Sequence, residues 1–193
     1  HPDHQEVHLG NLSFSSQGIM WTSVPGAEAT VQYGRDRLVV EGVQSVNGTQ
    51  RIEADGVIGT RAEALTVRAS NVDVAQLDQL LLTNFGATGM LNAEATVRGT
   101  IKDPRVEGTF TLAPGAFKQF AFESFGGSLR YGGRGLTVDT RLQQTRAAWL
   151  TAKGYLPLAF FSRPDDGGAV NDHDHETPTP GDLVDLQIAS SKI

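Results

Sequence analysis

The metal-binding side chains of this chain are concentrated in one short run, Asp172 to Glu176, which reads Asp-His-Asp-His-Glu. Imidazole and carboxylate groups are ligands that Zn²⁺ and similar cations take in proteins. His173 and His175 lie in a stretch rich in Pro, Gly and Asp, which gives the ligands no rigid frame, and the glycine and final acid of an EF-hand are missing. We therefore predict a solvated, flexible acidic loop over residues 163–182, with a cation site on the two histidines as the alternative.

Nucleophilic and acid–base catalysis lack their usual residues in this sequence. There is no cysteine and no G-x-S-x-G motif, and all five histidines lie outside residues 9–171. Glu94, Glu107 and Asp139 are candidate carboxylates, but alternation with apolar neighbours places them on the polar side of their strands. Gly-Gly pairs do not precede a predicted helix, so they indicate turns and not phosphate-binding loops. The sequence predicts a protein that is not an enzyme and needs no cofactor, with an all-β enzyme domain as a remaining alternative.

Composition narrows the class of partner. The chain has 193 residues, 39% of them hydrophobic, and a formal net charge of −6. Nucleic acid is excluded as an expected partner, because phosphate backbones are held by clustered Lys and Arg in basic proteins. No run approaches the ~18–20 apolar residues that span a bilayer. A new alternating segment opens at Asp182 and stops at Ile193, so we expect residues 1–193 to be one segment of a longer protein.

Alternation of apolar and polar residues is the main structural signal, and it is clearest between Gly108 and Leu158. A period of two places apolar side chains on one face of a strand, and glycines between the short segments indicate many turns. The pattern predicts an all-β fold with one apolar face. Eighteen side chains are expected to line that face: Ile52, Ala54, Ile58, Leu65, Val67, Leu91, Ala93, Ala95, Val97, Phe110, Leu112, Leu129, Tyr131, Leu136, Val138, Leu150, Ala152 and Leu156.

The period changes once, near residues 73–82, where Val74, Leu77 and Leu81 recur at helical spacing. Asp73 is a suitable N-cap, and Gln76 three residues later predicts a capping box. A helix of this length with one apolar face needs a sheet to lie on, so we expect it to cover one end of the apolar face.

The two halves of the sequence repeat with a constant offset of 98, so that residues 26–59 match residues 124–157. Tyr-Gly, Leu-x-Val and Ala-x-Gly pairs recur at this offset without a gap. A repeated sheet unit suggests an array in which each unit completes the core of its neighbour.

Several of these segments together resemble the C-terminal region of the TamB and AsmA-like family of Gram-negative envelope proteins. The matching segments are Gly89 to Ala93, Arg98 to Gly108, Leu112 to Phe117 and Ala152 to Leu158, preceded by the strand-then-helix step at Leu65 to Leu82. The resemblance covers about half the chain, from residue 65 to residue 158, and depends on the order of the segments more than on any one of them.

The resemblance implies an elongated antiparallel sheet curved into an apolar trough, or β-taco. It also implies a periplasmic protein anchored in the inner membrane, with a role in outer-membrane biogenesis and a barrel partner of the TamA type. The trough would bind the acyl chains of phospholipid and conduct them between the two membranes. The family offers no catalytic residues to transfer.

Two alternatives stay open at this point. The apolar face could instead be an ordinary core closed by a second sheet. The strand edges, of which Val184 to Ile188 is an example, could form a scaffold that pairs with a barrel protein or its substrate during outer-membrane assembly.

Overall fold

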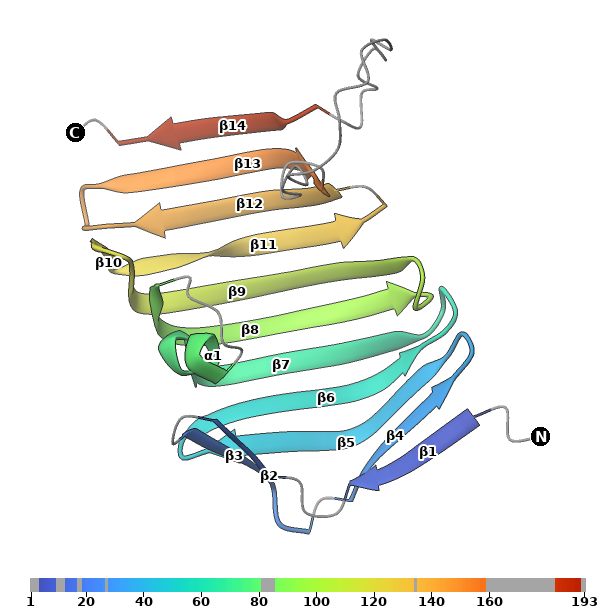
Figure 1. The fold of residues 1–193 in the computed structure, drawn as a ribbon. Coiled ribbons are helices and arrows are strands. Elements are labelled where there is room, and N and C mark those ends of the chain that lie inside the picture. The colour runs from blue at the N-terminus through green and yellow to red at the C-terminus, as the bar shows by residue number, and fades with distance from the viewer. Residues whose placement is uncertain are drawn as a thin grey trace, which may run out of the picture.

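The computed structural model describes residues 4–9, 13–16, 19–26, 28–80, 86–133, 135–158 and 183–191. These residues form an all-β fold with a single short helix, as predicted (Figure 1). The elements are β1 (His4–Leu9), β2 (Ser13–Ser16), β3 (Ile19–Ser23), β4 (Ala29–Gly34), β5 (Leu38–Asn47), β6 (Gln50–Ile58), β7 (Ala64–Asp73), α1 (Val74–Leu80), β8 (Ala87–Gly99), β9 (Pro104–Phe117), β10 (Phe120–Phe122), β11 (Ser124–Gly132), β12 (Gly135–Gln143), β13 (Trp149–Pro157) and β14 (Asp185–Ser190).

All fourteen strands belong to one antiparallel sheet, in the order β1-β4-β5-β6-β7-β8-β9-β11-β12-β13-β14. β10 pairs with the end of β9, and the β2–β3 hairpin joins β5 through β3. The path starts at β1 and ends at β14, so the sheet is open and has two edges. The alternative of a core closed by a second sheet is therefore wrong for the residues that the structure describes.

The sheet is bent by β-bulges in its first half. In β5 the register shifts between Val40 and Val43, and Gly42 between them has a φ of +63°. The N–H of Gly42 donates to the Asp55 carboxylate at 3.0 Å. A second shift lies in β7, where Asn71 has a φ of +53°. An extra residue on one strand bends it and increases the local twist, which curves this half of the sheet.

The strand pairing repeats with the offset found in the sequence. Val40 pairs with Gly56, and Val138 pairs with Gly154 in the same way. Gly56 in turn lies opposite Leu65 of β7, and Gly154 lies opposite Leu186 of β14. We call β4–β7 the first strand set and β11–β14 the second strand set.

One strand was not predicted, and one local expectation was wrong. Strand β1 lies in the polar start of the chain, where no apolar run indicates a strand and pairing with β4 stabilises it. The capping box at α1 is also different: Asp73 does accept the N–H of Ala75 at 3.0 Å, but the N–H of Asp73 donates to Gln50 and not to Gln76. The predicted loop at 163–182 and the cluster Asp172 to Glu176 lie outside the described residues.

Candidate functional site

One face of the sheet, here called the inner face, carries apolar ladders that cross many strands. In an antiparallel pair, directly opposed residues point to the same side, so the register identifies the members of each ladder. The longest ladder crosses nine strands with only aliphatic residues and glycine: Val43, Ala54, Val67, Ala95, Gly108, Leu129, Val138, Gly154 and Leu186. On one side of it, a parallel ladder runs from Val40 through Gly56, Leu65, Val97, Val106, Tyr131 and Leu136 to Leu156.

The register places all eighteen side chains predicted to line the trough on this inner face. The alternation of the sequence was sufficient to group them, because a period of two fixes the face of each residue within a strand. Further residues lie on the same face but were not predicted, since their strands are interrupted by bulges, glycines or turns: Val31, Leu38, Val40, Val43, Ala69, Val72, Val106, Phe125, Leu142, Leu186 and Ile188.

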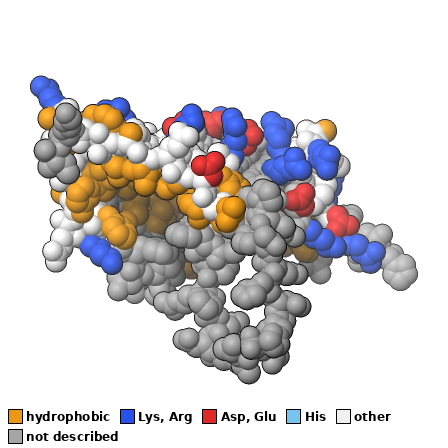
Figure 2. Space-filling view, turned by 90° about the horizontal axis from the view of Figure 1, so that it is seen from above, with side chains coloured by type: hydrophobic (Ala, Val, Ile, Leu, Met, Phe, Trp, Pro, Cys, Tyr) orange, Lys and Arg blue, Asp and Glu red, His pale blue; other side chains and the backbone are white. Residues whose placement is uncertain are grey.

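The inner face is not sealed. Of the eighteen predicted side chains only Ile58, Leu65 and Leu112 are buried, fourteen are partly exposed, and Leu150 is 41% exposed. The centre of a closed sandwich would instead bury most of them. Figure 2 shows hydrophobic side chains along a hollow of the surface, with charged side chains along the side of the sheet that faces away from it.

Small residues reduce the side-chain volume in the middle of the hollow. Ala93 of β8 lies opposite Phe110, and Phe110 lies opposite Gly127, which has no side chain. The same ladder contains Thr140, whose hydroxyl donates to the carbonyl of Ala152 at 3.2 Å. A hydroxyl that is satisfied within the sheet presents little polar surface, so this ladder also remains suitable for an apolar occupant.

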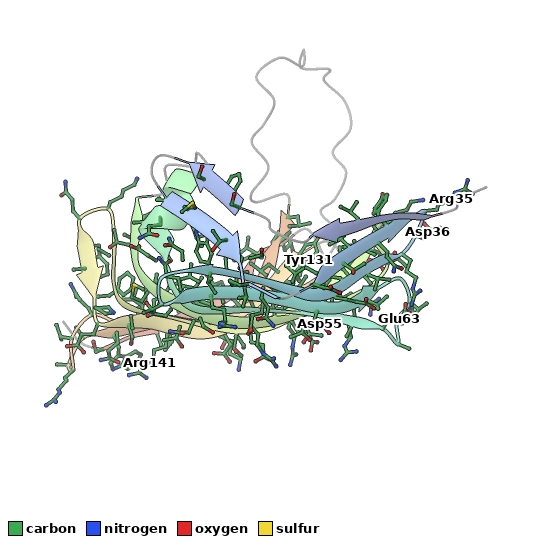
Figure 3. The ribbon with its side chains drawn as sticks, turned by 90° about the horizontal axis from the view of Figure 1, so that it is seen from below. Arg35, Asp36, Asp55, Glu63, Tyr131 and Arg141 are labelled. Carbon is green, nitrogen blue, oxygen red and sulfur yellow. The ribbon has the colours of Figure 1, made fainter. Side chains whose placement is uncertain are left out.

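One end of the inner face is covered by α1 and the β2–β3 hairpin, which lie on the same side of the sheet as Tyr131 (Figure 3). Gln50, the buried polar residue of this end, holds the helix in place. Its amide accepts the N–H of Asp73 at 2.7 Å and donates to Gln76 at 2.9 Å. Asn47 donates to the same Gln76 oxygen at 2.9 Å. Local sequence patterns do not reveal the role of Gln50, because its partners Asp73 and Gln76 are 23 and 26 residues away.

Aromatic side chains extend this cover across β9 to β11. Phe125 makes edge-to-face contacts with Phe110 and Phe122, with ring centroids 5.1 and 6.3 Å apart. Phe122 of β10 is buried, and so is Leu112, which lies opposite Phe125 in the register. Side chains are therefore buried at the end under α1, and a second small core of Val40, Ile58 and Leu65 lies at the opposite end of the strands.

The opposite, outer face carries cross-strand ion pairs. Arg68 contacts Glu94 at 3.2 Å, Lys153 contacts Asp139 at 2.8 Å, and Arg130 contacts Glu107 at 3.7 Å. The hydrogen bond from Arg68 lowers the pKa of Glu94 below its ordinary value, and the hydrogen bond from Arg37 does the same to the pKa of Glu63. Figure 3 shows Asp55, Glu63 and Arg141 on this side, away from Tyr131.

These positions do not assemble a reaction centre. Glu94, Glu107 and Asp139 are exposed, and each is paired with a cation on the outer face. Among the described residues no three His, Asp or Glu side chains gather closely enough to hold a metal ion. His173 and His175 are outside that part of the chain. No helix in the described ranges is long and apolar enough to cross a membrane.

Comparison with known proteins gives no relative: no family model, no curated protein and no solved structure matches this chain. The class that the fold and the site define is an open all-β sheet with one continuous apolar face and one charged face.

Proposed function

We propose that this chain is a non-enzymatic segment of a Gram-negative envelope protein of the TamB and AsmA-like type, whose inner face binds acyl chains and conducts phospholipid between the inner and outer membranes. The observation that carries the proposal is the nine-strand apolar ladder from Val43 to Leu186, together with its partial exposure. An extended, partly exposed apolar surface of this kind is typical of a site that binds an apolar partner.

The hydrophobic effect alone would favour binding of an acyl tail, without any specific contact. Each methylene that moves from water to an apolar surface gains ~0.8 kcal/mol. Ten methylenes laid along the ladder would gain ~8 kcal/mol before the entropy of ordering the chain is subtracted. Headgroups would remain in water at the open side of the hollow. In this proposal the protein is periplasmic, its full-length form is anchored in the inner membrane, and a TamA-type barrel is its outer-membrane partner.

Photo-cross-linking tests this proposal at adjacent residues of one strand pair. Leu129 and Val138 face each other on the inner face, and Ser128 and Asp139 face each other on the outer face. Benzoylphenylalanine at either inner position should yield phospholipid adducts in cells, whereas the outer positions should yield none. Equal labelling on both faces, or no lipid at the inner positions, would remove the conduit from consideration.

Native mass spectrometry gives an independent measurement. The substitutions Ala93→Arg and Ala95→Arg place charge on the inner face, and we expect them to remove co-purified phospholipid. Thr109→Arg and Thr111→Arg are matched controls on the exposed outer face of β9 and should retain it. Circular dichroism checks that both double variants keep their strand content.

The edge at β14 supports a second candidate, a scaffold for assembly of outer-membrane barrel proteins. In the described part of the chain β14 pairs only with β13, and Val184 and Ile188 are 47% and 63% exposed. An exposed apolar edge strand is a template for a further strand. If proline at Gln187 abolishes barrel binding while lipid adducts at Leu129 persist, the chain has the scaffold role as well.

A further inference from the structure

Three arginines gather on the outer face, at the opposite end of the strands from α1. Arg61 comes from the turn between β6 and β7, Arg98 from the end of β8, and Arg105 from the start of β9. They surround a hollow of about 330 Å³, whose lining is completed by Thr96, Gly99 and Glu107. The site is distinct from the inner face and from its ladders.

The pairing of Arg98 with Arg105 sets this place apart from the rest of the outer face. The two residues are directly opposed in the register of β8 and β9. Like charges at opposed positions destabilise a sheet, because their side chains are held close together. At three other places on the outer face a cation lies directly opposite a carboxylate, as Arg68 lies opposite Glu94.

Nothing within the described residues neutralises these three cations. None of the three arginines forms a hydrogen bond or an ion pair with another residue that the structure describes. Glu107 is the carboxylate in the lining of the hollow, and its oxygen lies 3.7 Å from Nε of Arg130. The lining thus holds three positive charges and one shared negative charge, in a chain whose net charge is −6.

Two backbone segments approach each other closely in the wall of the hollow. Gly99 is buried with a φ of +94°, and a Cβ at this position would meet the carbonyl oxygen of Asp103 at 2.5 Å. Only glycine fits there without strain. The hydroxyl of Thr96 supplies one further donor to the lining.

We propose that Arg61, Arg98 and Arg105 form a binding site for a phosphate group. Guanidinium groups bind phosphate oxygens through paired N–H donors, and two converging arginines offer four such donors to one anion. The phosphate could be part of an anionic lipid headgroup at a membrane surface or a free phosphate in solution. The site goes beyond the proposed conduit and stands without it, since none of its residues belongs to the inner face.

The test uses two probes and one matched control. Inorganic phosphate is titrated while the arginine Nε–Hε resonances are followed by NMR. Flotation is then measured with vesicles of phosphatidylcholine, with and without phosphatidic acid. The test variant is Arg98→Gln with Arg105→Gln. The control is Arg35→Gln with Arg146→Gln, which removes the same charge at exposed positions outside the hollow.

We expect the test variant to bind phosphatidic acid vesicles about 30-fold more weakly than the wild type, and to lose most of its phosphate-induced shifts. Increasing salt should weaken wild-type binding. Binding of inorganic phosphate without binding of vesicles would assign the site to free phosphate. Equal losses in the test and control variants, or no binding of either probe by the wild type, would overturn the proposal. Lipid cross-linking at Leu129 should be unchanged in the test variant, so failure of this site and failure of the conduit are distinguishable.

Discussion

The two strand sets share their pairing, but only the first set buries aliphatic side chains of its inner face, at Val40, Ile58 and Leu65. Val40 and Ile58 of the first set are each 8% exposed and pack with Leu65 in a small core. Their equivalents at the offset of 98, Val138 and Leu156, are only partly buried. The same residue types in the same register therefore produce a core in one place and an open surface in another.

This difference in burial arises from residues that differ between the two copies of the repeat. Gly42 bulges from β5 and is anchored by Asp55, whereas its equivalent is Thr140, in a strand pair whose register is unbroken. Gln50 holds α1 over the first set, whereas its equivalent is Ala148, which has no amide to hold a helix. Val40, Ile58 and Leu65 lie at the opposite end of the strands from α1, so curvature at the β5 bulge accounts for this core, while α1 covers a separate part of the inner face.

The largest difference in stability between the two strand sets should come from substitution of the equivalent glycines, Gly56 and Gly154. Gly56 has a φ of +125° and Gly154 a φ of +152°, and a Cβ would meet the carbonyl oxygen of Ala64 or Asp185, respectively. Gly56→Val should destabilise the whole protein by more than about 4 kcal/mol, because backbone strain and a clash occur inside the core. Gly154→Val should mainly detach the edge strand β14. Urea denaturation measures the first effect, and hydrogen exchange at Leu186 measures the second.

A smaller difference in the free energy of unfolding should separate alanine variants of the equivalent residues Ile58 and Leu156. Ile58→Ala should lower the free energy of unfolding by about 2–4 kcal/mol, since it leaves a cavity in the core. Leu156→Ala should lower it by about half as much, because the side chain is already partly exposed, and should weaken retention of lipid instead. Equal losses of stability in delipidated protein would mean that the second set is closed in solution.

The cover can be removed separately from the core. Gln50→Ala leaves the N–H of Asp73 without its acceptor and removes one of the two donors to the Gln76 oxygen, at about 1–3 kcal/mol. Ala148→Gln, at the equivalent position, should change stability by much less. Circular dichroism of the helical signal and thermal denaturation of both variants provide the measurement. Helix loss in Ala148→Gln but not in Gln50→Ala would contradict this account of the cover.

The outer-face ion pairs should have the smallest effect, because they occur in both sets. Arg68 lowers the pKa of Glu94 from its ordinary 4.5, so the folded state binds this proton less readily than the unfolded state. The resulting stabilisation is present above about pH 4.5 and is lost as the pH falls through the lowered pKa. Arg68→Gln should return the Glu94 pKa toward its ordinary value in an NMR titration. An unchanged pKa in this variant would show that Arg68 is not its cause.

Alternation predicted the fold class and the face of each lining residue, because both depend on neighbours within one strand. It could not predict the open or closed state, which depends on contacts of long range. Gln50, the bulge at Gly42 and the strand β1 are defined only by partners far along the chain. The arginine hollow was missed for the same reason, because Arg61 comes from the β6–β7 turn, 37 residues before Arg98 in the sequence.

The unbroken ladder from Val43 to Leu186 also has a kinetic consequence. Strands are spaced about 4.8 Å apart, so nine of them make a track of about 40 Å in which every rung is aliphatic or bare backbone. If the inner face carries acyl tails as proposed, a tail that advances by one rung exchanges one apolar contact for another of similar energy. Movement along such a track meets low friction and has no preferred direction, so any net flux would have to be driven by a difference in lipid supply at its two ends.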